Sequence, residues 1–320
     1  MRAFFYEATG TDKEVTLSAS VVTELHNEQL LWVDVGEPEE RELRHIASLL
    51  SLTRESVYTL LQTEYRPRLD NYDSYSQLNI NTIQEVDGNY KPVELDFVFG
   101  SNFVLTVHRQ PVEFLQNFDQ RVKGDSNLGQ LDAPAFMTTL LDWHITSYFR
   151  LIEALDHEVD KIDAQALRPS NSRDLLADLS KLRYRVAFVR RTLTPHREVY
   201  SAMARRDFHL IAKSDSAAHF TLLQDRLERA IEAVENAREL LIGSFDIFTT
   251  QTALRTNEAM KALTLVSVTL LPATVIIGIS GFWVESPVYQ LGQAVFWLML
   301  TLIASIATVT LVVARRCRWI

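Results

Sequence analysis

The chain has 320 residues, of which 47% are hydrophobic and 23% charged, so it is long enough to bury a substantial core. Its formal net charge is −9, which argues against nucleic-acid binding, because that binding depends on Lys and Arg that neutralise phosphates. An acidic body kept soluble by its charge and a surface that attracts cations are both compatible with this balance.

The N-terminal part of the chain predicts strands followed by a helix. Short apolar or alternating runs at 2–8, 14–20 and 29–35 are typical of strands separated by turns. Residues 37–40 then form an acid-rich turn containing Pro38, after which apolar residues recur at helical spacing. We therefore expect a strand that leads into a helix after Gly36.

Strand patterns return at residues 75–86, 93–99 and 102–108, and Asp87-Gly88-Asn89 is typical of a tight turn. Helical periodicity follows at 111–122 and again from 133 to about 166. The order of strands mixed with helices, then helices alone, predicts an α/β cytosolic domain whose sheet is covered by helices, followed by a helical stalk.

Four carboxylates within the predicted helix at 133–166 recur at spacings of three or four, and so share one face: Glu153, Asp156, Asp160 and Asp163. Stacked carboxylates repel one another unless a partner or an ion is present, which favours a solvated face over a cation-binding one. Asp156 and Asp160 remain candidate metal ligands on the second interpretation.

A long helix is predicted in the second half of the chain. Residues 174–206 form one helix, which Pro195 kinks or ends. From about residue 218 the helical pattern is uninterrupted to Pro272, and it plausibly extends to Gly281. Such a long helix is not stable alone in water, so we expect it to pack on the shorter helices before it or on copies of itself.

Two uncharged runs, 262–284 and 286–314, close the chain, and each is long enough to cross a hydrocarbon core of about 30 Å as a helix. The connection between them carries only Glu285. The basic residues lie on the outer flanks: Lys261, Arg315, Arg316 and Arg318. By the positive-inside rule both ends of the membrane region face the cytoplasm. No apolar stretch of signal-peptide length is found at the N-terminus.

These patterns predict an α+β membrane protein in six segments. They are a cytosolic α/β domain (1–168), a stalk (169–261), a first span (262–284), an outer loop (285–291), a second span (292–314) and a basic tail (315–320). The only cysteine, Cys317, lies in that tail and cannot form an internal disulfide. The chain has no Gly-rich phosphate loop and no His or Cys cluster at metal-ligand spacing, so we do not expect an enzyme.

The first span gathers polar and small side chains on one side. Spacings of three and four place the following residues on one stripe, with Leu263 at its edge: Asn257, Met260, Thr264, Ser267, Leu271, Thr274, Gly278 and Gly281. Small and hydroxyl side chains also serve close helix packing in membranes, so packing is one interpretation.

The other interpretation of this stripe is a pore formed by several copies of the chain. Asn257, Thr264, Ser267 and Thr274 would offer oxygens to a hydrated cation, while Leu263 and Leu271 would form hydrophobic constrictions. Two helices per chain do not enclose a pathway, so a pore requires an oligomer.

Residues 256–285 resemble the signature segment of the CorA family of divalent-cation transporters, whose first span ends in Gly-Met-Asn before an acidic loop. The features shared with that segment are the Asn257-Glu258 pair, Pro272, Gly278, Gly281 and Glu285. The similarity extends over nearly the whole chain: WVDV at 32–35, Arg-Pro-Arg at 66–68, NFVLTVHR at 102–109 and the basic C-terminus.

The resemblance implies a funnel-shaped homopentamer in the inner (plasma) membrane, with no cofactor and a divalent cation as substrate and possible regulator. Its first spans would line the pore, with Asn257, Leu263, Leu271 and Thr274 at pore positions, and its second spans would form an outer ring. Mg²⁺, Zn²⁺, Co²⁺ and Ni²⁺ are the candidate ions. A non-conducting relative with a regulatory or scaffolding role is the alternative.

The sequence departs from the family at two places. Gly281-Phe282-Trp283 replaces Gly-Met-Asn, and Trp has no acceptor with which to bind the water shell of Mg²⁺. Magnesium selectivity therefore stays open. The family's regulatory carboxylate aligns with Leu222, and Asp225, one turn further on, is a candidate substitute.

Overall fold

The structure is a computed structural model that describes residues 1–7, 13–26, 29–122, 132–166, 172–205, 208, 217–282 and 292–316. By internal contacts the chain divides into two units. The first unit comprises Met1–Gln165 and Arg173–Ser244, and the second comprises Ala166–Ser172 and Phe245–Ile320. The segment boundaries predicted from sequence stay predictions, and the outer loop at 285–291 lies outside the described residues.

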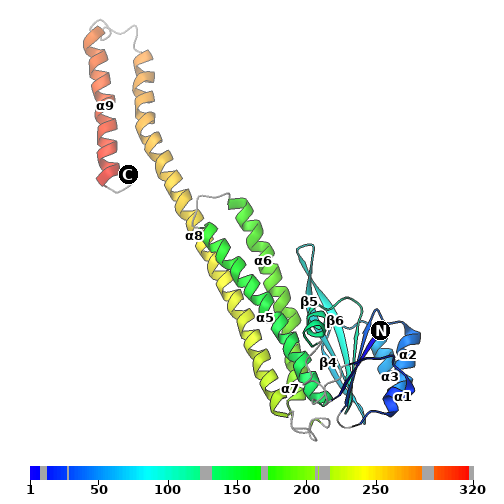
Figure 1. Ribbon diagram of the computed structural model, residues 1–320. Coiled ribbons are helices and arrows are strands. Elements are labelled where there is room, and N and C mark those ends of the chain that lie inside the picture. The colour runs from blue at the N-terminus through cyan, green and yellow to red at the C-terminus, as the bar shows by residue number, and fades with distance from the viewer. Residues whose placement is uncertain are drawn as a thin grey trace. The chain divides into compact units, whose positions relative to one another are not determined.

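The first unit is built on a seven-stranded sheet in the order β2-β1-β3-β7-β6-β5-β4 (Figure 1). The strands are β1 (Arg2–Glu7), β2 (Lys13–Glu14), β3 (Gln29–Gly36), β4 (Arg68–Asn71), β5 (Ser76–Val86), β6 (Asn89–Phe99) and β7 (Phe103–His108). β3 and β7 pair in parallel, whereas the other described pairs are antiparallel. Gly36 and His108 are therefore neighbours at one edge of the sheet.

The predicted tight turn is confirmed between β5 and β6. Asp87 and Gly88 are the two residues between these strands, and both have positive φ, 53° and 74°. Two consecutive residues with positive φ are typical of the type I′ hairpin turn, whose twist matches that of the flanking strands.

Helices cover both faces of the sheet. The described helices of the whole chain are α1 (Ala19–Thr23), α2 (Glu40–Leu49), α3 (Arg54–Leu61), α4 (Glu113–Val122), α5 (Ala133–Ala166), α6 (Ser172–Leu193), α7 (His196–Met203), α8 (Ala217–Phe282) and α9 (Gly292–Arg316). On one face, Ile46 of α2 and Val57 of α3 join a buried cluster with Val33 of β3. On the other, Trp32 of β3 meets Phe118 of α4 and Phe136 of α5 at ring distances of 5.8 and 5.7 Å. The predicted α/β domain with a covered sheet is confirmed.

The strand predicted at 14–20 is wrong. β2 is confined to Lys13–Glu14, and helix α1 occupies Ala19–Thr23. β1 runs antiparallel to this segment, so Phe4 pairs with Glu14 and the Val15 N–H reaches the Ala3 carbonyl at 2.9 Å. One residue further, the segment reaches Arg2, where β1 begins, so no further residue of β1 supplies the partner groups that a longer β2 would need.

The long helix is confirmed: α8 contains 66 residues and includes Pro272. Its first part packs on shorter helices, as expected from its length, because Leu227 and Val234 are buried there. Arg197 of α7 also forms a bidentate ion pair with Glu228 of α8, with both N···O distances 2.7 Å. Pro195 separates α6 from α7, so it ends the helix that sequence predicted through 206.

Candidate functional site

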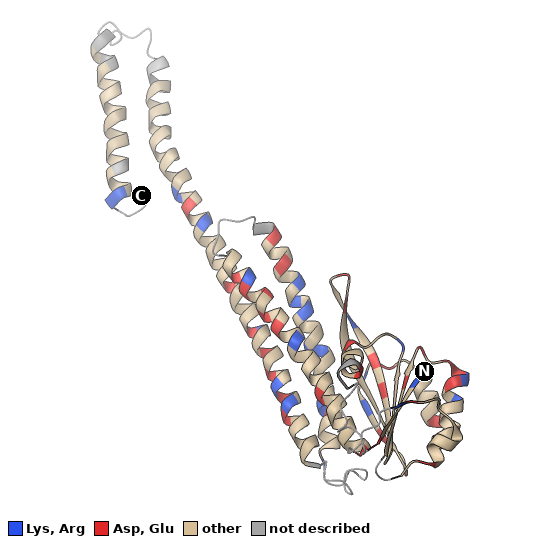
Figure 2. Ribbon diagram, viewed as in Figure 1, with Lys and Arg blue, Asp and Glu red and all other residues tan. Residues whose placement is uncertain are grey.

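The last part of α8 and nearly all of α9 form an uncharged pair of helices in the second unit. Figure 2 shows the described part of α8 without Asp, Glu, Lys or Arg beyond Lys261, and α9 with basic residues only at its C-terminal end. Both helices are long and apolar enough to cross a membrane, and the apolar window of α8 has no buried residue. A long apolar surface exposed in a single chain requires lipid or other helices to cover it.

The predicted stripe lies on this uncovered part of α8. Its large apolar members are all exposed: Met260 by 57%, Leu263 by 61% and Leu271 by 64%. Asn257, Ser267 and Gly278 are exposed as well. One chain by itself therefore leaves the stripe unpaired, and the single chain does not distinguish helix packing from a pore.

The threonine hydroxyls of the stripe are oriented by the helix itself. Thr264 donates its hydroxyl hydrogen to the Met260 carbonyl at 2.7 Å, and Thr274 donates to the Leu271 carbonyl at 2.8 Å. Since the hydrogen is used within the helix, the lone pairs of each hydroxyl oxygen remain for an outside donor or cation. Thr269, on the opposite side of α8, donates in the same way to Leu265.

The signature residues lie at the end of α8. Gly281 and Phe282 are the last residues of the helix, whereas Trp283 and Glu285 lie outside the described residues. The predicted outer mouth therefore stays a prediction.

The predicted regulatory position lies on the first part of α8. Leu222 is 63% exposed, and Asp225 is exposed one turn further on. A groove between α5 and α8 is lined by Leu222 together with His219, Arg226 and Arg229. Arg226 pairs with Asp142 across this groove. A groove lined by more basic than acidic side chains is a poor site for a cation. Asp225 is not among the residues that line this groove, so within one described chain the groove gives it no role as a metal ligand.

The acidic face of α5 does not become a metal site within one chain. Burial and the neighbouring charge of Asp160 raise the pKa of Asp156 above its ordinary range. In the described part of the chain, no group of three or more His, Cys, Asp and Glu side chains is arranged to hold a metal ion. A site shared between copies that uses Asp156, Asp160 or Asp225 stays a prediction.

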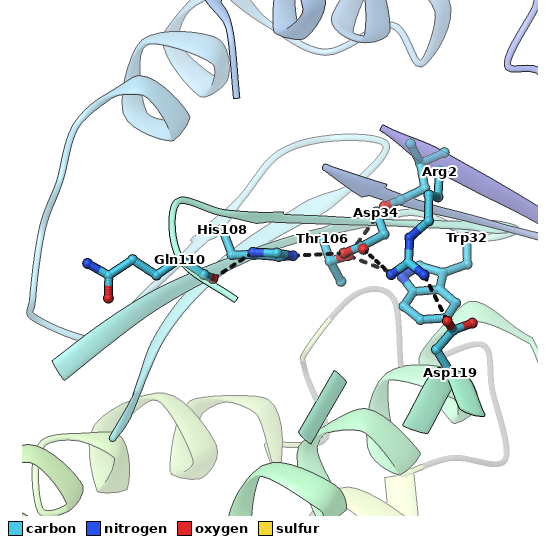
Figure 3. A network of polar contacts seen from close by, with 8 residues as sticks. Arg2, Trp32, Asp34, Thr106, His108, Gln110 and Asp119 are labelled. Atoms are coloured by element: carbon cyan, nitrogen blue, oxygen red, sulfur yellow. Dashed lines mark hydrogen bonds and ion pairs between the residues drawn. The ribbon is translucent and has the colours of Figure 1, made fainter. Parts of the chain in front are cut away.

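The sequence motifs of the first unit meet in one polar network, which Figure 3 shows at the edge where β3 and β7 end. Asp34 accepts hydrogen bonds from Arg2 at 2.9 Å and from Thr106 at 2.7 Å, and it lies 3.3 Å from His108. Arg2 also donates to Asp119 of α4 at 2.8 Å. Burial alone would raise the pKa of Asp34, but the bonds from His108 and Thr106 outweigh it and lower that pKa.

This network ties four elements together and has a structural role. Arg2 belongs to β1, Asp34 to β3, Thr106 to β7 and Asp119 to α4. Each of these four side chains forms a hydrogen bond or an ion pair with another member of the network. The network therefore stabilises the packing of these elements by pairing their buried charges. His108, whose Nε2 lies 3.3 Å from Asp34 Oδ1, is part of this structural network.

Sequence reasoning missed a second buried network, in which helices α5 and α7 dock on one residue of β5. The backbone N–H of Asn81 donates to His196 Nε2 at 3.0 Å. Its carbonyl accepts from Tyr148 at 2.7 Å and from His144 Nε2 at 3.0 Å. β4 pairs with β5 only as far as Asn79, so these side chains replace a missing strand partner. The signal that could have found this network is the His-x-x-x-Tyr spacing, which occurs at His144–Tyr148 on α5 and again at His196–Tyr200 on α7 and places both side chains of each pair on one helix face.

Together the two units define a class of protein: an α/β domain whose longest helix, α8, continues into the first of two segments that can span a membrane, the second being α9. Residues 27–316 match the family described as CorA-like Mg2+ transporter protein. The chain therefore belongs to this family of membrane-bound metal-ion transporters, and the resemblance noted in its sequence is confirmed.

Its relatives are metal transporters by name. The divalent cation transporter CmaX of Pseudomonas aeruginosa is 25% identical over 320 residues, which cover 97% of this chain and 94% of the relative. The cobalt/magnesium transport protein CorA of Thermotoga maritima is 23% identical over 266 residues, covering 82% of this chain and 75% of the relative.

Solved structures share the fold along the whole chain. The complete CorA magnesium transporter from Methanocaldococcus jannaschii matches with a TM-score of 0.82 at 18% identity, covering 100% of this chain and 99% of that one. Full-length CmaX matches with a TM-score of 0.77 at 22% identity, covering 100% and 98%. At these identities the likeness is one of fold.

Proposed function

We propose that the protein conducts a divalent cation through a homopentameric pore lined by the stripe of α8. In this proposal α9 lies outside the pore-lining helices, and both chain ends face the cytoplasm from the inner (plasma) membrane. The basic residues at the C-terminal end of α9 and Lys261 on α8 support that orientation through the positive-inside rule. The polar body, including α8 up to about Lys261, would then form the cytosolic part.

The observation that carries the proposal is the orientation of the threonine hydroxyls on an otherwise apolar helix. Thr264 and Thr274 already donate to their own helix, so their oxygens can act only as acceptors toward the outside. A ring of such oxygens, one from each copy, supplies partial negative charge to a hydrated cation without a fixed charge that would trap it. Leu271 lies between these two positions and would form a constriction that closes by drying.

The conducted ion need not be Mg²⁺. Trp283 replaces the amide residue that the family presents at the outer mouth, and an indole offers an N–H donor and a π face instead of an oxygen. Mg²⁺ gives up its water reluctantly and depends on oxygen partners for that shell. Zn²⁺, Co²⁺ and Ni²⁺ are therefore candidates beside Mg²⁺.

A flux assay with a matched pair of variants tests the proposal. The full-length protein is placed in liposomes that contain a metal-sensitive dye, and Mg²⁺, Zn²⁺, Co²⁺ and Ni²⁺ are supplied in turn. We expect flux of at least one ion, reduced about tenfold by Thr274→Val, which corresponds to a barrier higher by about 1.4 kcal/mol. Thr269→Val makes the same chemical change off the stripe and should leave the flux unchanged.

Two results would contradict this function. Equal losses in Thr274→Val and Thr269→Val would show that the stripe does not line the path. Absence of flux for all four ions, from protein that forms its oligomer, would favour a non-conducting CorA-like protein with a regulatory or scaffolding role, in which Trp283 blocks the mouth.

A further inference from the structure

A cluster of buried polar side chains that neither network described above includes lies in the first unit, on the face of the sheet that α2 and α3 cover. Asn79 of β5 lies directly opposite Asp96 of β6, and Asn81 lies opposite Glu94. Residues directly opposite in an antiparallel pair project to the same face, so these four side chains are neighbours. All four are buried, with exposures from 1% for Asn81 to 8% for Glu94.

The two carboxylates are held together by one amide. Asn79 Nδ2 donates to Glu94 Oε1 at 2.9 Å and to Asp96 Oδ1 at 3.0 Å. Glu94 Oε1 also accepts the backbone N–H of Glu64 at 2.7 Å. Burial raises the pKa of both carboxyl groups, that of Asp96 to about 7, because their charges lack full compensation.

The neighbouring arginines do not pair with these carboxylates. Arg68 forms ion pairs with Glu64 at 3.1 Å and with Asp70 at 2.7 Å, and Arg109 donates to the Leu61 carbonyl. Among the residues that the structure describes, no Lys, Arg or His lies within ion-pair distance of Asp96. A buried negative pair without a cationic partner is unfavourable.

Unpaired amide atoms surround the same pair. Asn79 Oδ1 and both polar side-chain atoms of Asn81 are buried without a hydrogen-bond partner in the described chain, and so is Gln77 Nε2. Asn81 is almost fully buried and lies directly across from Glu94, so its amide faces into the cluster. Buried polar atoms are nearly always satisfied in proteins, by water or an ion where no protein group serves.

We propose that a hard divalent cation of the Mn²⁺, Ca²⁺ or Mg²⁺ kind binds between Asp96 and Glu94, with the side-chain oxygens of Asn79 and Asn81 completing the donor set. Carboxylate and amide oxygens are the ligands that these ions prefer. The Asn79 Nδ2 group now occupies the position between the two carboxylates. Rotation of that amide by half a turn presents Oδ1 to the ion instead.

The site is separate from the conduction path, because it uses only residues of β5 and β6 and none of the stripe. A cation there satisfies the unpaired amide oxygens and neutralises both carboxylates in one step. It therefore favours the folded first unit, since the unfolded chain does not bring these oxygens together.

Binding stoichiometry of Mn²⁺ to the full-length protein in detergent tests the site, with free Mn²⁺ counted by electron paramagnetic resonance after dialysis. We expect Asp96→Asn to bind one Mn²⁺ fewer per chain than the natural protein. Glu94→Gln should lose the same ion. Asp73→Asn, which neutralises an exposed carboxylate before β5, is the matched control and should bind as many ions as the natural protein. Ions in the pore contribute equally to all of these proteins and cancel in the comparison.

Unchanged stoichiometry in Asp96→Asn and Glu94→Gln would overturn the proposal. A second measurement uses the natural protein and so does not depend on whether a variant folds. It is anomalous diffraction from crystals grown with Mn²⁺. We expect a peak between Asp96 and Glu94, with oxygen atoms of both at coordination distance. A pocket that holds only water, with no anomalous peak, would also overturn it.

Discussion

His144 and His196 are neutral at physiological pH because they are fully buried and hydrogen-bonded as neutral rings. Burial lowers the pKa of His144 to about 3 and that of His196 to about 4. His196 Nδ1 donates to the Leu193 carbonyl while Nε2 accepts from Asn81, a pattern that only the neutral ring can make. Each histidine therefore opposes protonation of the folded state.

The consequence is a loss of stability in acid. In the unfolded chain both rings titrate near pH 6.5, so below that pH the unfolded state binds protons that the folded state excludes. The free energy of unfolding should fall by up to about 1.4 kcal/mol per pH unit for each ring between about pH 6 and 4. We expect His196→Gln to flatten this dependence in chemical denaturation, and exposed His157→Gln to leave it unchanged. An unaltered slope in His196→Gln would contradict the assignment.

If the proposed function holds, the residue at position 283 should influence which ion the protein selects. Trp283→Asn restores an amide oxygen where the family has one, and it should shift the flux ratio toward Mg²⁺ and away from Zn²⁺, Co²⁺ or Ni²⁺. The measurement is the ratio of initial rates in the same liposome assay. Trp297→Asn, a change of the same size within α9, is the control. A flux ratio identical to that of the natural protein would show that Trp283 does not set selectivity.

Among the secondary elements, the β5–β6 hairpin of the first unit depends on the backbone conformation of its two-residue turn. Gly88 has φ of +74° in its turn, a region that disfavours residues with a Cβ. Gly88→Ala should lower the free energy of unfolding by about 1 kcal/mol. Gly243→Ala, on a helical position with open space around the added Cβ, should instead raise it by up to about 1 kcal/mol. Equal effects in a denaturation experiment would contradict this account of the turn.

Local sequence patterns predicted the elements whose partners lie nearby. The β5–β6 hairpin follows from Asp87-Gly88, and α8 follows from an uninterrupted periodic pattern. The strand predicted at 14–20 was wrong because its end depends on where its antiparallel partner β1 begins, which is a property of the pairing register. Helix α3 and strand β4 were not predicted, because both are short and their mixed composition shows no clear period. The cap on α3, in which the Ser56 N–H donates to the Thr53 hydroxyl, becomes visible only in the structure.

The same distinction holds for the candidate sites. The stripe on α8 could be read from spacing, because all of its residues lie on one helix. The groups around Asn81 come from β5, α5 and α7, and those of the buried carboxylate pair come from two strands. The repeated His-x-x-x-Tyr spacing marks the docking side chains on α5 and α7, but only the folded chain brings them to β5, and the carboxylate pair shows no such motif.

At the scale of the whole molecule, the proposed function requires several copies of the chain. In the described residues, one chain leaves the stripe of α8 uncovered and supplies two helices that can span a membrane, and two helices do not enclose a path. In lipid nanodiscs we expect particles of five chains, counted by native mass spectrometry. Five chains that associate only through their first units would not be sufficient for the proposal, because the stripes of neighbouring copies must also face one another.

Cross-linking between copies at single cysteines is the most direct test of the claim that the stripes of several copies face a shared axis. In a Cys317→Ser background, Ser267→Cys places a thiol on the stripe and Val268→Cys places one at the next position, away from its centre. With a short bifunctional thiol reagent applied to membrane vesicles, the Ser267→Cys protein should form covalent dimers and the Val268→Cys protein should remain monomeric. Dimers formed only by Val268→Cys, or by neither protein, would contradict a shared axis lined by the stripe.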